Sequence, residues 1–132
     1  MKINRRAVLT GIATAAVLPC LAAEARAEGL GKSEMPGGGV ILTAVVKANP
    51  GEEETVREIL LGLVDLTRKE PGCLCYNLHQ SKSDNAQFMF YEQWATQEAF
   101  DAHGKMPYMK ALGGKLKGHT EKGVLTFYQL LK

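Results

Sequence analysis

The sequence lacks an excess of charge of one sign. Its 132 residues contain 16 lysine and arginine residues against 14 aspartate and glutamate residues, a net charge of +2. Four of these basic residues and one acidic residue lie in the first 27 positions, so the remainder carries 12 basic against 13 acidic residues, a net charge of −1. Nucleic-acid-binding proteins concentrate Lys and Arg on one face. The charge balance therefore argues against nucleic acid as a partner.

The sequence also lacks an apolar run strong enough to anchor it in a membrane. Residues 7–23 are only weakly apolar, because Gly11 and Pro19 interrupt them. A stable membrane-spanning helix needs about 20 predominantly apolar residues. We therefore expect no stable membrane anchor.

The same N-terminal stretch has the features of an export signal. A basic start leads into the weakly apolar stretch, and Ala25-Arg26-Ala27 places small residues where a signal peptidase cleaves. The segment Asn4-Arg5-Arg6-Ala7-Val8-Leu9 resembles a twin-arginine signal, with the general secretory route as the alternative. We predict a twin-arginine-like signal peptide over residues 1–27, cleaved after Ala27, and a periplasmic or secreted mature protein.

Motifs for binding metals, flavins or dinucleotides are missing as well. No dinucleotide fingerprint is present, and the three histidines, His79, His103 and His119, are scattered without paired carboxylates. Residues 28–39 are rich in glycine, and their run Gly37-Gly38-Gly39 follows no strand and precedes no Lys-Ser or Lys-Thr pair, which indicates a flexible lead-in and not a phosphate loop. We predict no cofactor and no metal site.

The remaining residues, 40–132, predict one small domain that begins with a strand and a helix. Residues 40–48 are rich in β-branched side chains and predict a strand covered on both faces. Asn49 as N-cap, Pro50 at the first position and Glu52 in a capping box predict the start of a helix, which Pro71-Gly72 ends. Its apolar stripe has helical spacing and consists of Val56, Ile59, Leu60, Leu63, Val64 and Thr67.

The second half of the domain predicts a hairpin, a broken helix and a last strand. Strands over residues 73–82 and 86–95 are joined by a short turn at 83–85. Thr96 caps a helix that is interrupted at residues 104–107, and the last strand covers residues 124–131. The order β-α-β-β-α-β predicts an α+β, ferredoxin-like fold with a four-stranded antiparallel sheet.

The strands carry large side chains on both faces. Phe88, Phe90, Glu92 and Trp94 alternate with Met89, Tyr91 and Gln93. Two helices cover only one face of such a sheet, so the other face needs a partner. Because symmetric dimers are the commonest solution, we predict a homodimer whose sheets pack face to face.

Cys73 and Cys75 are two residues apart on a predicted strand. This spacing places them on one face at the far edge of disulfide geometry, so an internal bridge would be strained. A redox role and a metal site with His79 remain open, and buried thiols are the favoured interpretation.

Four segments of the domain carry a resemblance to a known family. They are Lys69-Glu-Pro-Gly-Cys73 with Tyr76, Phe90-Tyr-Glu-Gln-Trp94, Glu98-Ala-Phe-Asp-Ala-His103 and Pro107-Tyr-Met-Lys-Ala111. The sequence resembles the antibiotic biosynthesis monooxygenases, which are dimeric α/β barrel proteins, and within them the quinol monooxygenase branch. The resemblance implies a homodimer that oxidises a quinol or related electron-rich aromatic with O₂ and needs no cofactor.

The resemblance also implies site residues. His103 would take the phenolic proton, and Trp94 would line the pocket and offer its indole N–H. The substrate would be bound by Tyr76, Asn77, Phe90, Phe100 and Tyr108. Tyr108 stands where quinol oxygenases and related isomerases commonly have a second histidine. A helix cap for His103 and a core position for Trp94 are the structural alternatives.

Two other functions remain open at this point. The protein could be an isomerase or other proton-transfer enzyme acting on a small carbonyl compound. It could also be a non-catalytic binder of hydrophobic small molecules.

Overall fold

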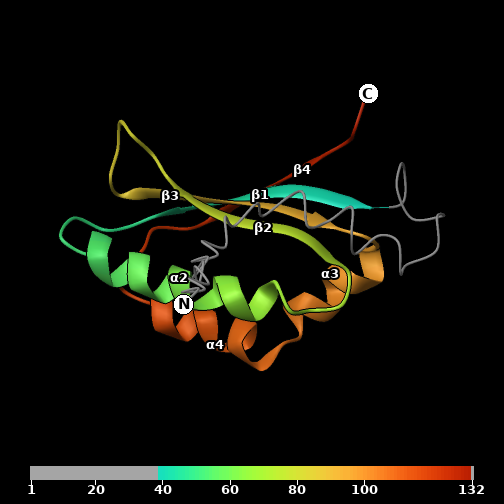
Figure 1. Ribbon diagram of the computed structural model, residues 1–132. Helices are drawn as coiled ribbons and strands as arrows, with labels where there is room; N and C mark the ends of the chain where they lie inside the picture. The colour runs from blue at the N-terminus through green and yellow to red at the C-terminus, as the bar shows by residue number, and fades with distance from the viewer. Residues whose placement is uncertain (1–38, 132) are drawn as a thin grey trace, which may run out of the picture.

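A computed structural model describes residues 39–131, which form three helices packed on a four-stranded sheet (Figure 1). The elements are β1 (Val40–Lys47), α2 (Glu53–Thr67), β2 (Cys73–Gln80), β3 (Gln87–Trp94), α3 (Gln97–Gly104), α4 (Pro107–Leu116) and β4 (Val124–Tyr128). The strand order is β2-β3-β1-β4, and every neighbouring pair is antiparallel. The ferredoxin-like prediction is confirmed.

Some predictions concern residues outside this range. The signal peptide over residues 1–27 and all but the last residue of the lead-in over 28–39 lie outside the described residues. Within residues 39–131, no helix is long and apolar enough to cross a membrane.

The core lies between the helices and the face of the sheet that they cover (Figure 1). On β3 the even-numbered residues Phe88, Phe90, Glu92 and Trp94 are all buried, and the residues between them are partly exposed. From α2 the predicted stripe supplies Val56, Leu60, Leu63 and Thr67, all buried. The alternation along the strand and the helical spacing therefore both place the core as predicted.

The start of α2 differs from the prediction. The helix begins at Glu53 with Glu52 as its N-cap and has no side-chain capping bond. Gly51 adopts a left-handed φ of +84°, so a turn separates Asn49 from the helix. The side chain of Asn49 donates instead to the carbonyl of Gly118, and the predicted capping box is wrong.

The strands end earlier than predicted. Between β2 and β3 the side chain of Asp84 accepts from the Ala86 N–H, and Gln80 donates to the Asn85 carbonyl, so a longer loop replaces the short turn. At the other edge, Tyr128 pairs with Ile41 near the start of β1, so β4 has almost no further β1 residue to pair with.

The two cysteines lie on opposite faces of the sheet, which corrects the expectation that they share one. Cys73 pairs with Trp94 and Cys75 with Gln93, because an irregularity in β2 inserts Leu74 between them. Such a bulge shifts the alternation by one residue. Both cysteine side chains are buried, as favoured.

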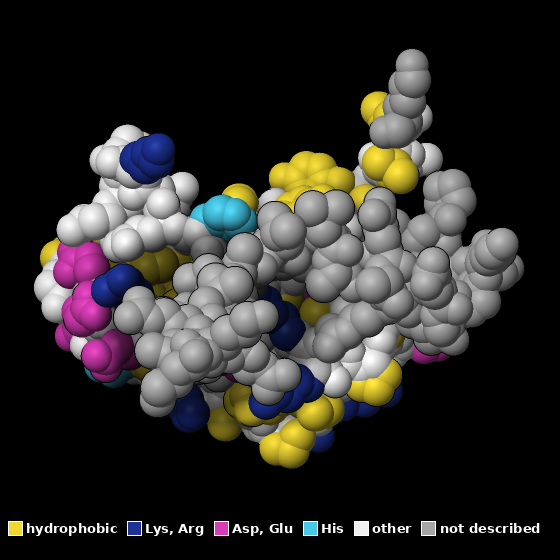
Figure 2. Space-filling model, in the orientation of Figure 1, with side chains coloured by type: hydrophobic (Ala, Val, Ile, Leu, Met, Phe, Trp, Pro, Cys, Tyr) yellow, Lys and Arg dark blue, Asp and Glu magenta, His cyan; other side chains and the backbone are white. Residues whose placement is uncertain are grey.

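Among residues 39–131, no helix lies over the other face of the sheet (Figure 1). Figure 2 shows hydrophobic side chains gathered along this upper side of the molecule. On this face of β4, Val124 and Tyr128 are each more than half exposed. The predicted need for a partner therefore persists in the single chain.

Candidate active site

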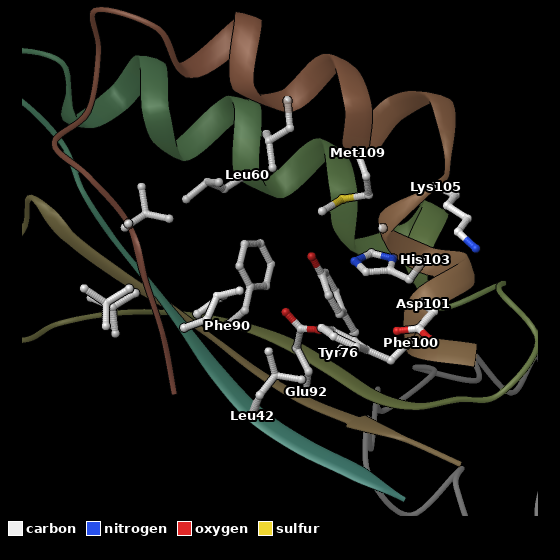
Figure 3. Close-up of a pocket in the computed structure, with 18 residues that line it drawn as sticks. Leu42, Leu60, Tyr76, Phe90, Glu92, Phe100, Asp101, His103, Lys105 and Met109 are labelled. Atoms are coloured by element: carbon white, nitrogen blue, oxygen red, sulfur yellow. The ribbon is translucent and has the colours of Figure 1, made fainter. Parts of the chain in front are cut away.

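A cavity of about 630 Å³ lies between the sheet and the helices α3 and α4 (Figure 3). Apolar side chains from every layer line most of it, among them Leu42, Leu60, Phe90, Phe100, Met109 and Leu112. Its polar lining includes Tyr76, Glu92 and His103, while Asp101 and Lys105 also border it. Drug-sized ligands occupy cavities of this size and character.

His103 is held rigidly at the inner wall of this cavity. Thr96 caps α3 as predicted by accepting the Ala99 N–H, which fixes the helix that carries His103. The imidazole is only 3% exposed. Its ring centroid lies 4.7 Å from that of Trp94 and 5.6 Å from that of Tyr76. Aromatic contacts on two sides therefore fix the plane of the imidazole.

Glu70 completes the fixation of His103, although it was not among the predicted site residues. Its carboxylate lies 2.9 Å from Nδ1 of His103 and is itself buried. The Tyr108 hydroxyl donates to the same carboxylate oxygen and lies 3.3 Å from the Thr67 hydroxyl. A carboxylate accepts hydrogen bonds, so Nδ1 carries the proton in neutral His103. Nε2 is then the nitrogen left to accept a proton from a ligand.

Glu92 is the second buried carboxyl group of the site and was also missed. It is 4% exposed, and its Oε2 accepts the indole N–H of Trp94 at 3.0 Å. Burial raises the pKa of Glu92, and the Trp94 hydrogen bond and His103 offset only part of that rise. The protonated, neutral form is therefore favoured relative to an ordinary glutamate.

The predicted substrate-binding residues divide into two groups. Tyr76, Phe90 and Phe100 line the cavity together with His103. Tyr76 and Phe90 lie in contact, with ring centroids 4.7 Å apart. Burial and the nearby Glu92 raise the pKa of Tyr76, so its hydroxyl stays protonated.

Trp94, Tyr108 and Asn77 do not line the cavity. Trp94 is fully buried behind His103, and its indole N–H is used by Glu92. Tyr108 contacts Glu70, and burial together with that hydrogen bond raises the pKa of Tyr108 to about 12. Asn77 pairs with Tyr91 on the uncovered face and accepts a hydrogen bond from Arg68. Trp94 and Tyr108 thus hold Glu92, His103 and Glu70 in place without lining the cavity. Asn77 lies on the other face of the sheet.

The described residues contain no group of three or more His, Cys, Asp or Glu side chains that could hold a metal ion. Glu70 and Glu92 instead flank one imidazole, with aromatic rings around it.

Comparison with known proteins places this site in a family. The profile described as antibiotic biosynthesis monooxygenase matches residues 39–113, which contain every side chain of the Glu70, Glu92 and His103 cluster. The chain belongs to this family. The four motif segments quoted from the sequence all fall within the matched range.

Solved structures agree with membership of the monooxygenase family. A protein of Pseudomonas aeruginosa is 27% identical with a TM-score of 0.70, covering 73% of this chain and 97% of that one. A candidate antibiotic biosynthesis monooxygenase of Caulobacter crescentus is 26% identical with a TM-score of 0.66, covering 72% and 92%.

A curated relative is similar over a shorter range. An uncharacterised protein of Synechocystis sp. is 26% identical over 69 residues, which are 52% of this chain and 47% of that protein. The chain thus spans about half the length of the curated relative it matches.

Proposed function

We propose that this protein is a monooxygenase that oxidises a quinol or a related electron-rich aromatic with O₂, without a metal or organic cofactor. The observation that carries the proposal is the Glu70–His103 pair at the wall of a largely apolar cavity. Membership of the family supports the monooxygenase reaction class. The cavity offers the base and the apolar walls that such a reaction requires.

The first step is a proton transfer. Nε2 of His103 takes the proton of a phenolic hydroxyl, and Glu70 stabilises the imidazolium through Nδ1. A positioned base of this kind contributes about 10²–10⁴-fold to the rate. The apolar walls keep water away from the electron-rich anion that results.

Oxidation then proceeds on the substrate itself. The anion passes one electron to O₂, and the substrate radical and superoxide combine into a ring peroxide. Proton return from His103 and loss of water leave one oxygen atom in the product. For a simple quinol, one quinol and one O₂ give one hydroxyquinone and one water. The substrate is the only reductant in this scheme.

The homodimer and export are parts of the same proposal. The exposed apolar side chains of β4 and the uncovered face of the sheet support a second copy of this chain as the partner. The sequence of residues 1–27 supports export to the periplasm.

Oxygen consumption tests the proposed reaction. The purified, metal-free mature protein is assayed with a panel of hydroquinones beside His103→Ala and Trp94→Phe. We expect uptake above autoxidation in the wild type and a fall of at least about 10²-fold in His103→Ala at unchanged oligomeric state. Trp94→Phe should cause a smaller loss, because the ring contact with His103 is largely kept. No uptake with any quinol would contradict the proposal.

A further inference from the structure

Two polar atoms of the cavity are left for a ligand. Oε2 of Glu92 accepts the indole N–H of Trp94, and Nδ1 of His103 is hydrogen-bonded to Glu70. Within residues 39–131, Oε1 of Glu92 and Nε2 of His103 have no hydrogen-bond partner. No side-chain nitrogen or oxygen of the described residues is both fully buried and unpartnered. Since both residues line the cavity, these two atoms are accessible from it.

The same neighbours fix both groups. The Trp94 indole donates to Glu92, and its ring lies against that of His103 at 4.7 Å. Tyr76 pairs directly with Glu92 across β2 and β3, and its ring lies 5.6 Å from His103. Figure 3 shows Glu92 and His103 on the two sides of Tyr76. Their separation is therefore set by rigid, buried aromatic groups.

Apolar side chains surround this polar pair. Leu42, Leu60, Phe90, Phe100 and Met109 suit a flat aromatic ring system and offer it no hydrogen bond. A ligand with one hydroxyl satisfies His103 and leaves the Glu92 carboxyl unpaired in an apolar site, which is costly.

We propose that Glu92 is a specificity-determining residue whose Oε1 binds a second oxygen of the substrate while His103 binds the first. The site then selects aromatic compounds with two oxygen substituents, dihydroxy or keto-hydroxy, over monophenols. This inference deepens the proposed function and rests on it for the position of the reacting hydroxyl at His103.

The chemistry of a neutral carboxyl group fits this role. Protonated Glu92 can donate to a carbonyl or phenolate oxygen and accept from a hydroxyl. Burial in the cavity wall favours that form. In a diol, the negative charge left when His103 removes the first proton spreads only to ring carbons. In a keto-hydroxy compound with a conjugated carbonyl, the charge spreads to the carbonyl oxygen, and a hydrogen bond from Glu92 becomes stronger at that moment.

Binding without oxygen tests the inference separately from turnover. Dihydroxynaphthalenes with the second hydroxyl at different ring positions are titrated anaerobically by calorimetry. Each is compared with the naphthol that carries a methyl group in place of that hydroxyl, which keeps the size nearly constant. The wild type should prefer at least one diol about tenfold over its methyl counterpart, the effect of one good hydrogen bond.

Three variants locate the origin of that preference. Glu92→Leu should abolish it, and Glu92→Gln, which keeps a polar group and the contact with Trp94, should retain most of it. Glu58→Gln removes an exposed carboxylate of α2 and serves as the matched control. Thermal unfolding checks that each variant is folded, and Glu92→Met, an unbranched apolar replacement of similar length, takes the place of Glu92→Leu if that variant does not fold.

The outcomes separate this inference from the proposed function. A diol preference that Glu92→Leu removes supports the role of Glu92, even if no quinol supports oxygen uptake. Absence of any preference in the wild type, or a preference that persists in Glu92→Leu, overturns it. If Glu92→Leu does not fold, loss of the diol preference in Glu92→Met with normal affinity for the methyl compound supports it, and a preference that persists in Glu92→Met overturns it.

Discussion

Glu70 acts on the reaction through His103 and is a positioning residue. Its carboxylate holds Nδ1 at 2.9 Å and so sets the tautomer that leaves Nε2 free. Replacement by glutamine removes the charge that stabilises the imidazolium. We expect Glu70→Gln to lower kcat for oxygen uptake about 10–10²-fold with little change in KM, a smaller loss than the about 10²–10⁴-fold contribution of the base itself, because His103 is kept.

The split between kcat and KM separates this positioning role from a loss of substrate binding. In Glu70→Gln the imidazolium that forms during the reaction has lost its carboxylate partner, so kcat should fall while KM stays near the wild-type value. Tyr108→Phe removes one hydrogen bond to Glu70 and keeps the carboxylate, so it should lower kcat less. Wild-type kcat in Glu70→Gln would refute the role.

Glu92 should make stability depend on pH in an identifiable direction. Burial raises its pKa in the folded protein above that in the unfolded chain. The folded state then binds the proton more tightly, so the free energy of unfolding falls as pH rises from about 4 toward the raised pKa. Glutamine does not ionise, so the free energy of unfolding of Glu92→Gln does not fall for this reason.

The measurement is the difference in free energy of unfolding between Glu92→Gln and wild type, obtained from urea titrations across this pH range. The difference should change in favour of the variant as pH rises. Glu58→Gln controls for the loss of one carboxylate at an exposed position. A difference that is flat with pH, or that moves in favour of the wild type, would show that burial does not penalise the Glu92 anion.

His103 was among the site residues predicted from the sequence, whereas its two carboxylate neighbours were not. Glu70 stands beside Pro71-Gly72 at a helix end, where an acidic residue is ordinarily solvated. Glu70 is buried only because α3 and α4 pack against it, where His103 and Tyr108 contact its carboxylate. Glu92 did carry a signal, because it is the one charged residue on the buried side of β3. A lone carboxyl group on an apolar face indicates a functional site.

The sequence predicted the start or end of an element correctly where a single local hydrogen bond determines it. Thr96 caps α3 because its side chain reaches the Ala99 N–H directly. At Asn49 two local preferences compete, and the left-handed turn at Gly51 prevails over the capping box. The bulge at Leu74 depends on the pairing of β2 with β3, which the sequence of β2 alone does not contain.

Gly72 connects α2 to β2 and has a strict requirement for glycine. Its φ is +79°, and a Cβ atom at this position would lie 2.5 Å from the Cβ of Ala99. Positive φ in a residue other than glycine costs about 1–3 kcal/mol. We expect Gly72→Ala to lower the free energy of unfolding by at least that amount in urea titrations, because the clash with α3 adds to the strain.

Gly62 provides the matched control for this substitution. It lies in the middle of α2 and is exposed, and a Cβ atom added to it would have no neighbouring atom within 4 Å. Gly62→Ala should stabilise the protein by about 0.5–1 kcal/mol through helix propensity. Equal effects of the two substitutions would contradict the special role of Gly72.

At the scale of the whole molecule, the uncovered face of the sheet predicts self-association. Met89 lies on this face, partly exposed, opposite Val45 and His79 in the neighbouring strands. We expect a dimer in sedimentation experiments and a shift toward monomer in Met89→Glu, because the interface would bury a charge without a partner. Leu61→Glu places the same charge on an exposed position of α2 and should leave the dimer intact. A monomeric wild type at high concentration would refute this proposal.

Export can be tested on the full chain in a bacterial host with both export routes. The predicted route requires the adjacent Arg5 and Arg6. Replacement of both by lysine should leave uncleaved precursor in the cytoplasm, whereas the wild type should begin after Ala27 when its mature N-terminus is sequenced. Normal export of the double variant would point to the general secretory route.

The central claim is that the cavity at His103 inserts oxygen from O₂ into its substrate without a cofactor. Mass spectrometry of the product formed under heavy-isotope dioxygen by the metal-free protein tests it most directly. The account predicts a product that carries one labelled oxygen atom, formed far more slowly by His103→Ala. A product without label, or equal labelled product from His103→Ala, would contradict it.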